Sequence, residues 1–393
     1  PGAAGAAWNG GGAVTSETPA IPPGAQRLAE MPRRIPVNGT FELTVRCNLH
    51  CKMCLFRHAD SENARLLAEE MTADEWIDMA RQAARAGTVN LLITGDEPLL
   101  RPDFCEIWEG VYQQGFLITL YTNATLVTPK VMETLRRYPP HKIGVTIYGA
   151  SPETYRKVCG DAAAFARAIA GIRQLQTLPS VLEFRTTIIK DNYADADAID
   201  ELVQREFGKE FRVTQARMVT KAVRGACADV ESCRLDPEDN VRLAFRRGIN
   251  LIKQYVGDRY DERNLLLEHV NVSEDDAFQP RLTLFGCDAG MRNYVISWDG
   301  QLLGCQMLGV FHTDARGQGF HTAWERFLLE VKLPPVNNTC LSCKSRNICN
   351  CCYASRYAET GFLDGLPDYV CKDTSILQAM YDRGESKHGK NEL

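Results

Sequence analysis

The sequence predicts an α/β fold: a partial barrel of six βα units, of the TIM type, followed by a small cysteine-rich domain. Three observations predict it. Short apolar runs alternate with amphipathic stretches from residue 36 to about residue 220. Helix start and stop signals fall between those runs. After residue 284 the composition changes to short β-type runs, glycine and clustered cysteine, which is typical of a small domain held together by metal.

Six runs rich in Val, Ile, Thr and aromatic residues are the expected strands. They span residues 41–45, 89–94, 116–121, 143–148, 182–189 and 211–216. Several are apolar almost throughout, as are strands buried on both faces of a parallel sheet. Six such units in succession imply a parallel sheet curled into a barrel, with its active site at the carboxyl ends of the strands.

The stretches between these runs carry helix signals. Residues 72–75 (TADE) form a capping box, with Thr72 as the cap and Glu75 three residues later. Thr128 and Ser151 each stand before a proline at the first helical position. Glycines stand where three helices are expected to end: Gly87, Gly115 and Gly208.

The chain is expected to divide into five segments. They are a flexible arm (1–35), the partial barrel (36–220), a helical linker (221–283), the cysteine-rich domain (284–378) and a C-terminal tail (379–393). The arm lacks the basic start and apolar block of a signal peptide. No apolar run reaches the roughly 18 residues that span a bilayer. A net charge of -5 gives no support for nucleic-acid binding, which leaves a basic footprint. We therefore expect a cytoplasmic protein with no nucleic-acid or membrane partner.

The chain has 15 cysteines, and most of them are clustered. Clustering in a long chain without a signal peptide favours metal binding over disulfides. The first group, Cys47, Cys51 and Cys54, directly follows the first expected strand with the spacing C-x3-C-x2-C. The second group comprises Cys287, Cys305, Cys340, Cys343, Cys349, Cys351, Cys352 and Cys371. Four more are expected to be ordinary thiols of the core and linker: Cys105, Cys159, Cys227 and Cys233.

The residues alone leave zinc open at both groups. A structural zinc site takes four ligands, and His50 or His58 could supply a fourth ligand beside the first three thiols. A zinc ribbon could use four cysteines of the second group, although the remaining thiols there would then have no role.

The first group resembles the signature of the radical S-adenosylmethionine (SAM) superfamily, and the resemblance covers roughly residues 36–220. It implies that Cys47, Cys51 and Cys54 bind a [4Fe–4S] cluster whose fourth iron chelates the amino and carboxylate groups of SAM. One electron from the cluster then cleaves SAM to a 5′-deoxyadenosyl radical.

Other motifs resemble SAM-contacting segments of that family. TGDEP (94–98) is similar to its GGEP motif, which implies cofactor contacts for Gly95, Asp96, Glu97 and Pro98. Asp96 replaces a glycine, and because Asp tolerates a left-handed backbone we expect it to keep the glycine-like turn. YTNAT (121–125) resembles a TNG-type motif, which adds Thr122 and Asn123.

Thr146 and Arg185 lie where related enzymes place groups for the ribose or carboxylate of SAM. An ordinary strand threonine and an ion-pair partner within the barrel are the alternatives for these two residues.

Residues 284–375 resemble the SPASM domain, which usually carries two auxiliary iron–sulfur clusters. The resemblance implies that one cluster takes Cys340, Cys343, Cys349 and Cys371. The other takes Cys287, Cys305 and either Cys351 or Cys352, because the expected ligand position is Tyr353. Adjacent residues of an extended chain point to opposite sides, so we do not expect both to reach the same cluster. We favour Cys352 because it is closer to the expected position. That cluster then has three protein ligands, unless Cys227, Cys233 or another group completes it, and its open iron could bind a substrate thiolate.

The resemblance implies a radical SAM oxidoreductase with three [4Fe–4S] clusters and SAM as cofactors. The expected function is maturation of a ribosomally made peptide, by a thioether or carbon–carbon crosslink, with a flavodoxin or ferredoxin type electron donor. A sulfatase maturase or a cofactor-biosynthesis oxidase is the alternative enzyme, and a non-catalytic zinc or iron–sulfur protein is the alternative of another class. No residue is assigned as a general base.

Overall fold

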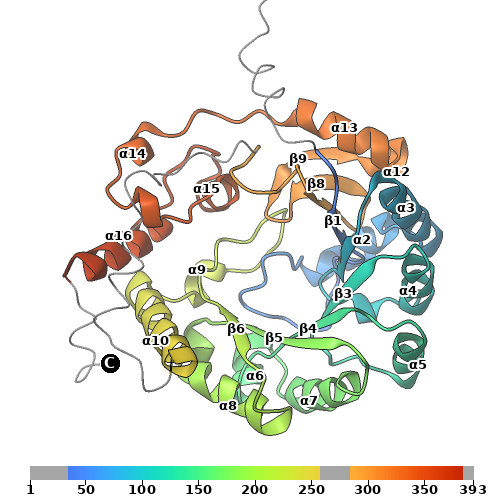
Figure 1. Cartoon of the computed structure of the whole chain (residues 1–393), viewed down its shortest axis with the longest axis horizontal. Helices are drawn as coiled ribbons and strands as arrows, with labels where there is room; N and C mark the ends of the chain where they lie inside the picture. The colour runs from blue at the N-terminus through green and yellow to red at the C-terminus, as the bar shows by residue number, and fades with distance from the viewer. Residues whose placement is uncertain (1–33, 257–283, 384–393) are drawn as a thin grey trace, which may run out of the picture.

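The computed structural model describes residues 34–256 and 284–383. Most of the expected arm and C-terminal tail, and part of the expected linker, lie outside these ranges. The strands form one sheet in the order β6-β5-β4-β3-β2-β1-β7-β8-β9. The first six are β1 (Asn38–Glu42), β2 (Asn90–Thr94), β3 (Leu117–Thr122), β4 (Lys142–Thr146), β5 (Val181–Thr187) and β6 (Val213–Ala216). Each pairs in parallel with the next, so the predicted partial barrel is confirmed (Figure 1).

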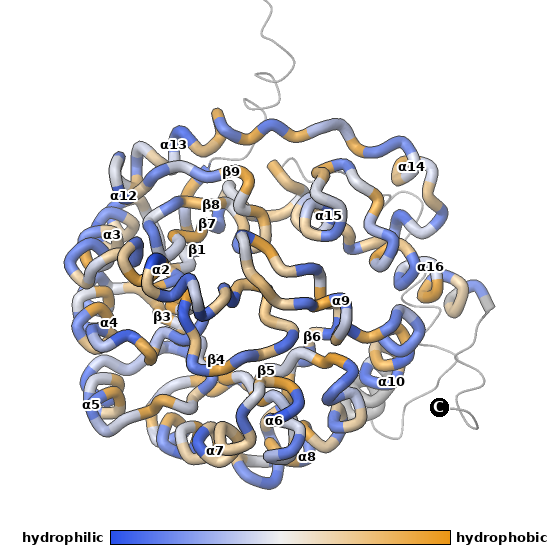
Figure 2. The backbone as a smooth tube through the Cα atoms, turned by 180° about the vertical axis from the view of Figure 1, so that it is seen from behind, coloured by the Kyte–Doolittle hydropathy of each residue, from blue (hydrophilic) through white to orange (hydrophobic). Residues whose placement is uncertain are grey.

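Helices connect these strands and lie on the outer side of the curved sheet (Figure 1). They are α2 (Asn63–Glu69), α3 (Ala73–Ala86), α4 (Phe104–Tyr112), α5 (Pro129–Arg137), α6 (Pro152–Cys159), α7 (Ala163–Leu175) and α8 (Ala196–Glu206). Seen from behind, polar and apolar residues alternate along most of them (Figure 2). An apolar stripe on each helix therefore faces the sheet, and a polar stripe faces water.

The predicted helix signals are present in the structure. The Thr72 hydroxyl accepts a hydrogen bond from the backbone N–H of Glu75, and the Glu75 carboxylate accepts one from the backbone N–H of Thr72. The same helix, α3, ends at Gly87, whose φ of +104° is the left-handed conformation expected of a C-terminal glycine. Pro129 and Pro152 begin α5 and α6.

The core lies between the sheet and the outer helices. Trp76 of α3 is fully buried and packs against Phe41 of β1, with 5.1 Å between ring centroids. Trp108 of α4 is equally buried, and its indole N–H donates to the carbonyl oxygen of Tyr138 at 2.9 Å. Burial of each large apolar side chain stabilises the fold by roughly 1.5–3 kcal/mol.

The cysteine-rich region begins as part of the same sheet. Its strands are β7 (Asn293–Ile296), β8 (Gln301–Cys305) and β9 (Leu308–Asp314). Strand β7 pairs in parallel with β1, from Asn38 opposite Asn293 to Phe41 opposite Ile296, and β8 and β9 follow antiparallel. The sequence predicts a change of composition at residue 284 but not that the sheet continues through it.

The remaining helices are α9 (Val230–Cys233), α10 (Pro237–Val256), α12 (Ala315–Gln318), α13 (Phe320–Glu330), α14 (Asn338–Leu341), α15 (Tyr353–Thr360) and α16 (Asp368–Arg383). Of these, α12 and α13 lie beside α3 and β8, α9 and α10 lie near β6, and α14, α15 and α16 lie on the far side of the ring from α4 (Figure 1). Helix α10 packs on α16, where buried Asn240 donates a hydrogen bond to buried Asp373. The linker therefore contacts the cysteine-rich region at both of its described ends.

Candidate functional site

The loop that carries the first three cysteines leaves the carboxyl end of β1. Cys47, Cys51 and Cys54 are all partly buried. The backbone N–H of Leu49 donates to the Cys47 sulfur at 3.4 Å, and Asn123 Nδ2 donates to the same sulfur at 3.8 Å. Turn formation brings the N–H of Cys54 to the carbonyl of Cys51 at 3.1 Å. The structure therefore places these thiols beside the predicted Asn123.

The three thiols are costly to ionise where they lie. Burial raises the pKa of Cys54 to about 12, and the nearby Asp96 raises it further. Burial and the charge of Glu97 raise the pKa of Cys47. A hydrogen bond with Cys159, followed by burial, raises the pKa of Cys51. A bound metal centre removes this penalty, because metal-bound thiols are deprotonated outright.

The donor set suits an iron–sulfur cluster. Soft thiolates select iron–sulfur clusters or zinc. Among the residues that the structure describes, no three of Cys, His, Asp or Glu converge closely enough to hold a single metal ion. Cluster ligands are spread more widely than that, because each binds a different iron.

The predicted GDEP segment is hydrogen-bonded to the chain that leads into the cysteine loop. Asp96 N–H donates to the carbonyl of Thr44 at 3.0 Å, and Glu97 N–H donates to the carbonyl of Arg46 at 3.1 Å. Gly95 has a φ of +139°, and a Cβ atom there would lie 2.6 Å from the Thr44 carbonyl oxygen. Only glycine fits this position without displacing the backbone of the cysteine loop.

Glu97 joins the GDEP segment to the predicted TNA segment. Its fully buried carboxylate accepts hydrogen bonds from Thr122 Oγ1 and the N–H of Asn123, both at 2.7 Å, and from the N–H of Leu99 at 3.0 Å. Burial raises the pKa of Glu97 to about 7, and these donors oppose the rise. Pro98 begins the short 3-10 helix Pro98–Leu100 that follows. Glu97 is therefore a positioning residue of the site.

The prediction that Asp96 keeps a glycine-like backbone conformation is wrong. Among the described non-glycine residues, only Ala124 and Arg224 have a positive φ, so Asp96 does not occupy a glycine-like turn. The turn is made by Gly95 one position earlier. The Asp96 side chain instead lines a cavity, and its Oδ2 atom is buried without a hydrogen-bond partner. Burial and the charge of Glu42 raise the pKa of Asp96 to about 8.

That cavity, here called the inner cavity, has a volume of about 190 Å³ and joins residues from three parts of the chain. The Glu42 carboxylate of β1 accepts hydrogen bonds from both terminal nitrogens of Arg224, at 2.7 and 2.8 Å. It also accepts one from Gln306 Nε2 at 2.9 Å. Phe56 and Trp298 lie beside the same guanidinium, with their ring centroids 4.8 and 5.7 Å from it.

Sequence reasoning missed Glu42, Arg224 and Gln306. The one available signal was Glu42 itself, a charged residue within the apolar run FELTV. In a strand covered by helices on its outer side, a glutamate is expected to face the barrel interior. Arg224 has a φ of +55°, and nothing in the sequence indicates that an arginine takes this conformation.

A larger outer cavity of about 600 Å³ adjoins the inner one, and Arg224 and Trp298 line both. Val223, Leu303, Met307, Val310 and Tyr357 give it an apolar wall, and its further ionisable side chains are Asp299 and His312. This volume is within the range of small-molecule and peptide side-chain pockets.

Thr146 and Arg185 pair across β4 and β5, at the carboxyl end of the sheet. Arg185 lies over the Tyr121 ring, 4.1 Å from its centroid, and forms an ion pair of 3.2 Å with Glu183. The ion-pair alternative for Arg185 therefore describes its contacts in this structure. Its Nε atom is buried without a partner.

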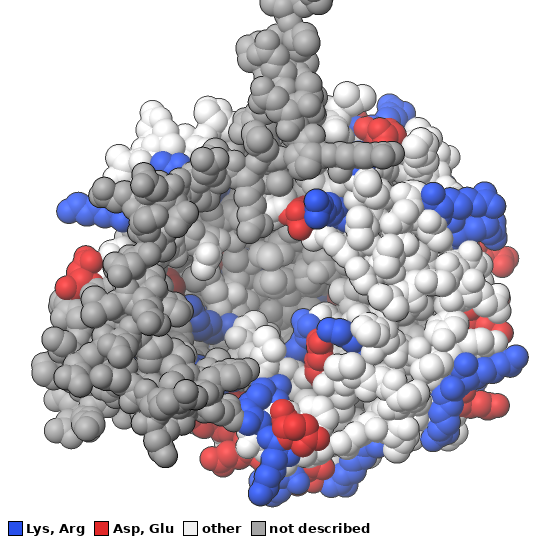
Figure 3. Space-filling model, in the orientation of Figure 1, with Lys and Arg blue, Asp and Glu red and all other residues white. Residues whose placement is uncertain are grey.

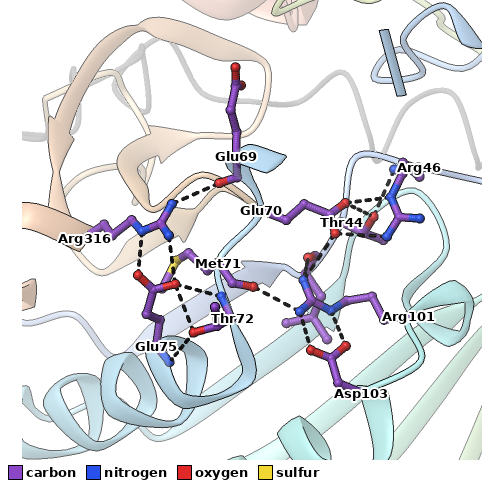
Figure 4. A network of polar contacts seen from close by, with 11 residues as sticks. Thr44, Arg46, Glu69, Glu70, Met71, Thr72, Glu75, Arg101, Asp103 and Arg316 are labelled. Atoms are coloured by element: carbon purple, nitrogen blue, oxygen red, sulfur yellow. Dashed lines mark hydrogen bonds and ion pairs between the residues drawn. The ribbon is translucent and has the colours of Figure 1, made fainter. Parts of the chain in front are cut away.

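A buried carboxylate, Glu70, supports the start of the cysteine loop from behind (Figure 4). It accepts two hydrogen bonds of 3.0 Å from Arg46, the residue before Cys47, and one from the Thr44 hydroxyl. Arg101, which follows the GDEP segment, lies 3.4 Å from the same carboxylate. This network holds the cysteine loop and the GDEP segment in fixed relative positions, and no local sequence signal indicates it.

The second group of thiols falls into two sets. Burial raises the pKa of Cys305, and the neighbouring thiols of Cys352 and Cys287 raise it further. Burial likewise raises the pKa of Cys371, next to the thiols of Cys349, Cys340 and Cys343. Cys351 has the thiols of Cys349, Cys352 and Cys371 among its neighbours, so it adjoins both sets. The assignment of Cys352 to the set of Cys287 and Cys305 stays a prediction, and the proximity of the Cys352 thiol to Cys305 agrees with it.

Comparison with known proteins identifies one segment of the chain. Residues 41–203 match the model of the Radical SAM superfamily. These residues are a radical SAM domain. The match begins within β1 and ends within α8, so it contains the first cysteine group and both motif segments.

Similar proteins include different radical SAM chemistries. The chain is 28% identical over 333 residues to an "AdoMet-dependent heme synthase" of Methanosarcina barkeri, which covers 82% of this chain and 92% of the relative. It is 29% identical over 201 residues to a "PqqA peptide cyclase" of Rhizobium meliloti, covering 50% of this chain and 52% of the relative.

Solved structures share the fold. Streptococcus suis SuiB bound to SAM superposes with a TM-score of 0.60 at 19% identity, over 86% of this chain and 77% of SuiB. SuiB bound to its precursor peptide SuiA gives 0.60 at 18% identity, over 86% and 76%. The prediction of a radical SAM enzyme is confirmed. In the described part of the chain, no helix has the length and apolar character to cross a membrane.

Proposed function

We propose that this radical SAM enzyme modifies a peptide, by forming a thioether or carbon–carbon crosslink in a ribosomally made substrate. The observation that supports a peptide is the charge of the two adjoining cavities. Their lining includes two carboxylates, Glu42 and Asp299, and the carboxyl group of Asp96, whose pKa is raised to about 8, against one arginine, Arg224, which Glu42 already engages. Such a lining disfavours a substrate that brings several carboxylates of its own.

The second candidate is a tetrapyrrole oxidation of the kind that the heme synthase relatives suggest. Similarity to the Methanosarcina barkeri heme synthase over 82% of this chain favours it. Heme carries carboxylate side chains, however, and the described walls of the two cavities offer them only Arg224 and His312. We therefore rank the peptide first and a cofactor-biosynthesis oxidase second; a sulfatase maturase remains the third enzyme considered.

The proposed cofactors are SAM and three [4Fe–4S] clusters. Cys47, Cys51 and Cys54 would hold the first, Cys340, Cys343, Cys349 and Cys371 the second, and Cys287, Cys305 and Cys352 the third. When bound there, the first cluster would supply the electron for the reductive cleavage of SAM. An external flavodoxin or ferredoxin type donor would deliver that electron.

The chain's own residues position these groups. Asn123 donates to the Cys47 sulfur, while Glu97 fixes the backbone of Asn123 and the turn after Gly95. Gly95, with no side chain, leaves room at the mouth of the cysteine loop. We assign Thr146 and Arg185 to the SAM side of the barrel, on the basis of their place at the carboxyl end of β4 and β5.

Anaerobic reconstitution with iron and sulfide, followed by an assay for 5′-deoxyadenosine, tests the reaction class. Changing Cys47, Cys51 and Cys54 together to Ala is expected to abolish SAM cleavage and to leave most of the iron bound. Continued SAM cleavage by the triple variant would refute the assignment.

The substrate class is tested by mass spectrometry. A short peptide encoded beside this gene is expected to lose hydrogen on incubation with the reconstituted enzyme, and an iron porphyrin with carboxylate side chains is expected to stay unchanged. Conversion of the porphyrin alone would replace the first candidate by the second.

A further inference from the structure

Arg356 stands out in the cysteine-rich region because it is a half-buried cation without a carboxylate partner. It lies on α15, four residues after Cys352. Its Nη2 atom lies 3.0 Å from the Cys340 sulfur, and Nη1 donates to the carbonyl of Gly365 at 2.9 Å. Over residues 34–256 and 284–383, no Asp or Glu forms an ion pair with it.

The contrast with Arg234 shows that this is not the general state of arginines there. Arg234 also reaches α15, where it pairs at 2.7 Å with Glu359, whose side chain is 4% exposed. A half-buried guanidinium costs free energy unless an anion faces it. The groups that face Arg356 are the thiols of Cys340, Cys349 and Cys351. Burial lowers the pKa of Arg356, but its contacts with these thiols outweigh that effect and raise it.

The Cys47 thiol of the first group has weaker donors. Cys47 receives only the neutral N–H groups of Leu49 and Asn123, at 3.4 and 3.8 Å. Hydrogen bonds to sulfur and local charge are among the factors that set the reduction potential of an iron–sulfur cluster. A cation at 3.0 Å from one ligand sulfur favours the reduced cluster, which carries one more negative charge.

We propose that Arg356 is a positioning residue that raises the reduction potential of the cluster held by Cys340, Cys343, Cys349 and Cys371. This inference rests on the proposed cofactor set. Because the Arg356 contact is made to a ligand of one cluster, the proposed clusters are expected to differ in reduction potential.

The test is an EPR-monitored redox titration of the full-length, reconstituted chain. The background is the variant with Ala at Cys47, Cys51 and Cys54, which removes the first cluster's signal. Arg356→Gln keeps a hydrogen-bond donor and removes the charge. We expect the reduced state to become about tenfold less favourable, a shift of the midpoint potential by about 59 mV to more negative values for one electron.

Two further variants separate charge from packing. Arg356→Lys keeps the charge and is expected to restore most of the potential. Lys372→Gln removes a fully exposed charge beside Cys371 and is expected to shift the potential far less, because water screens it. Equal shifts in Lys372→Gln and Arg356→Gln, or no shift in Arg356→Gln, would overturn the proposal.

Folding and cofactor failures are recognised by the iron content. If the Arg356→Gln variant loses iron while Arg356→Lys retains it, the charged contact is supported. If both lose it, the residue acts through packing and the proposal is overturned. If the background variant itself binds no iron, the proposed cofactor set fails, which is a different result.

Discussion

Asp96 and Glu97 are adjacent carboxyl groups whose environments differ. Glu97 accepts three hydrogen bonds, from Thr122, Asn123 and Leu99, which favour its charged form. Asp96 has one buried oxygen without a partner and faces Glu42, whose own charge is met by Arg224. Glu97 therefore joins its neighbouring segments through hydrogen bonds. Asp96 instead presents an oxygen without a hydrogen-bond partner to the cavity where the substrate or SAM would lie.

The raised pKa of Asp96 predicts a pH dependence of stability. Its pKa is about 8 in the folded chain against an ordinary value of 3.8, so between these values only the folded state holds the proton. The free energy of unfolding therefore falls as pH rises from about 4 to 8. In Asp96→Asn this contribution is absent, and the fall is expected to be shallower. Urea titrations of the reduced, cluster-free chain at pH 5 to 8 measure it.

The matched control is Glu106→Gln, which removes an exposed carboxylate of α4. The free energy of unfolding of this control should fall with pH as steeply as that of the unmodified chain. A slope that Asp96→Asn leaves unchanged would show that the Asp96 carboxyl is charged in the folded chain.

Glu70 and its neighbour Glu69 offer a second comparison. Glu70→Gln removes a buried charge that faces Arg46 and Arg101, and breaking such pairs costs about 3 kcal/mol or more. Glu69→Gln removes an exposed ion pair with Arg65, which contributes little to stability because water screens it. Urea denaturation is expected to separate them clearly. Equal losses would mean that the Glu70 network adds nothing to stability.

The turn between β2 and α4 is the element on which the proposed SAM site depends. Gly95→Ala would place a Cβ atom 2.6 Å from the Thr44 carbonyl, at a φ of +139°. Strain of this kind costs about 1–3 kcal/mol, and the clash displaces the cysteine loop. We expect Gly95→Ala to be destabilised and to lose SAM binding in equilibrium dialysis with the reconstituted enzyme.

Gly115→Ala is the control for that variant. Its φ of +87° is also left-handed, but nothing lies within 4 Å of its would-be Cβ atom. Gly115→Ala should lose stability through backbone strain and bind SAM normally. Normal SAM binding by Gly95→Ala would contradict the role given to the turn.

Local patterns sufficed for most elements of the barrel but not for partners distant in sequence. All six parallel strands were predictable, because their apolar runs and the caps between them are local signals. The neighbour of β1 on its second side was not, since Asn38 pairs with Asn293 and no local signal links them. For the same reason the sequence indicated the cysteines and the GDEP segment, but not the contacts of Glu42 with Arg224 and Gln306.

Because β7 completes the sheet beside β1, the barrel and the cysteine-rich region form one folding unit. A chain that ends at Val256 would leave unpaired the edge of β1 that pairs with β7 in the full chain. Exposed strand edges of this kind promote aggregation. Tyr294, fully buried against Gly39, would also be missing. We expect the truncated chain to aggregate in light scattering where the full chain, prepared identically, does not. A monodisperse truncated chain would show that the barrel folds independently.

On the face shown in Figure 3, Lys and Arg lie beside Asp and Glu around the rim, without an extended patch of one sign. Ionisable groups also lie below the surface: Glu42 is buried and lines the inner cavity with Asp96, and half-buried Arg356 contacts the Cys340 thiol.

The placement of β1 between β2 and β7 also has a consequence for synthesis on the ribosome. Asn38 emerges early, but its partner Asn293 is translated 255 residues later (293 minus 38). At about 5–20 residues per second, that interval is roughly 10 to 50 s. During this time the nascent chain carries the loop of Cys47, Cys51 and Cys54 on a strand whose second edge is open. The sheet beside that loop is therefore completed only after the cysteine-rich region has been translated.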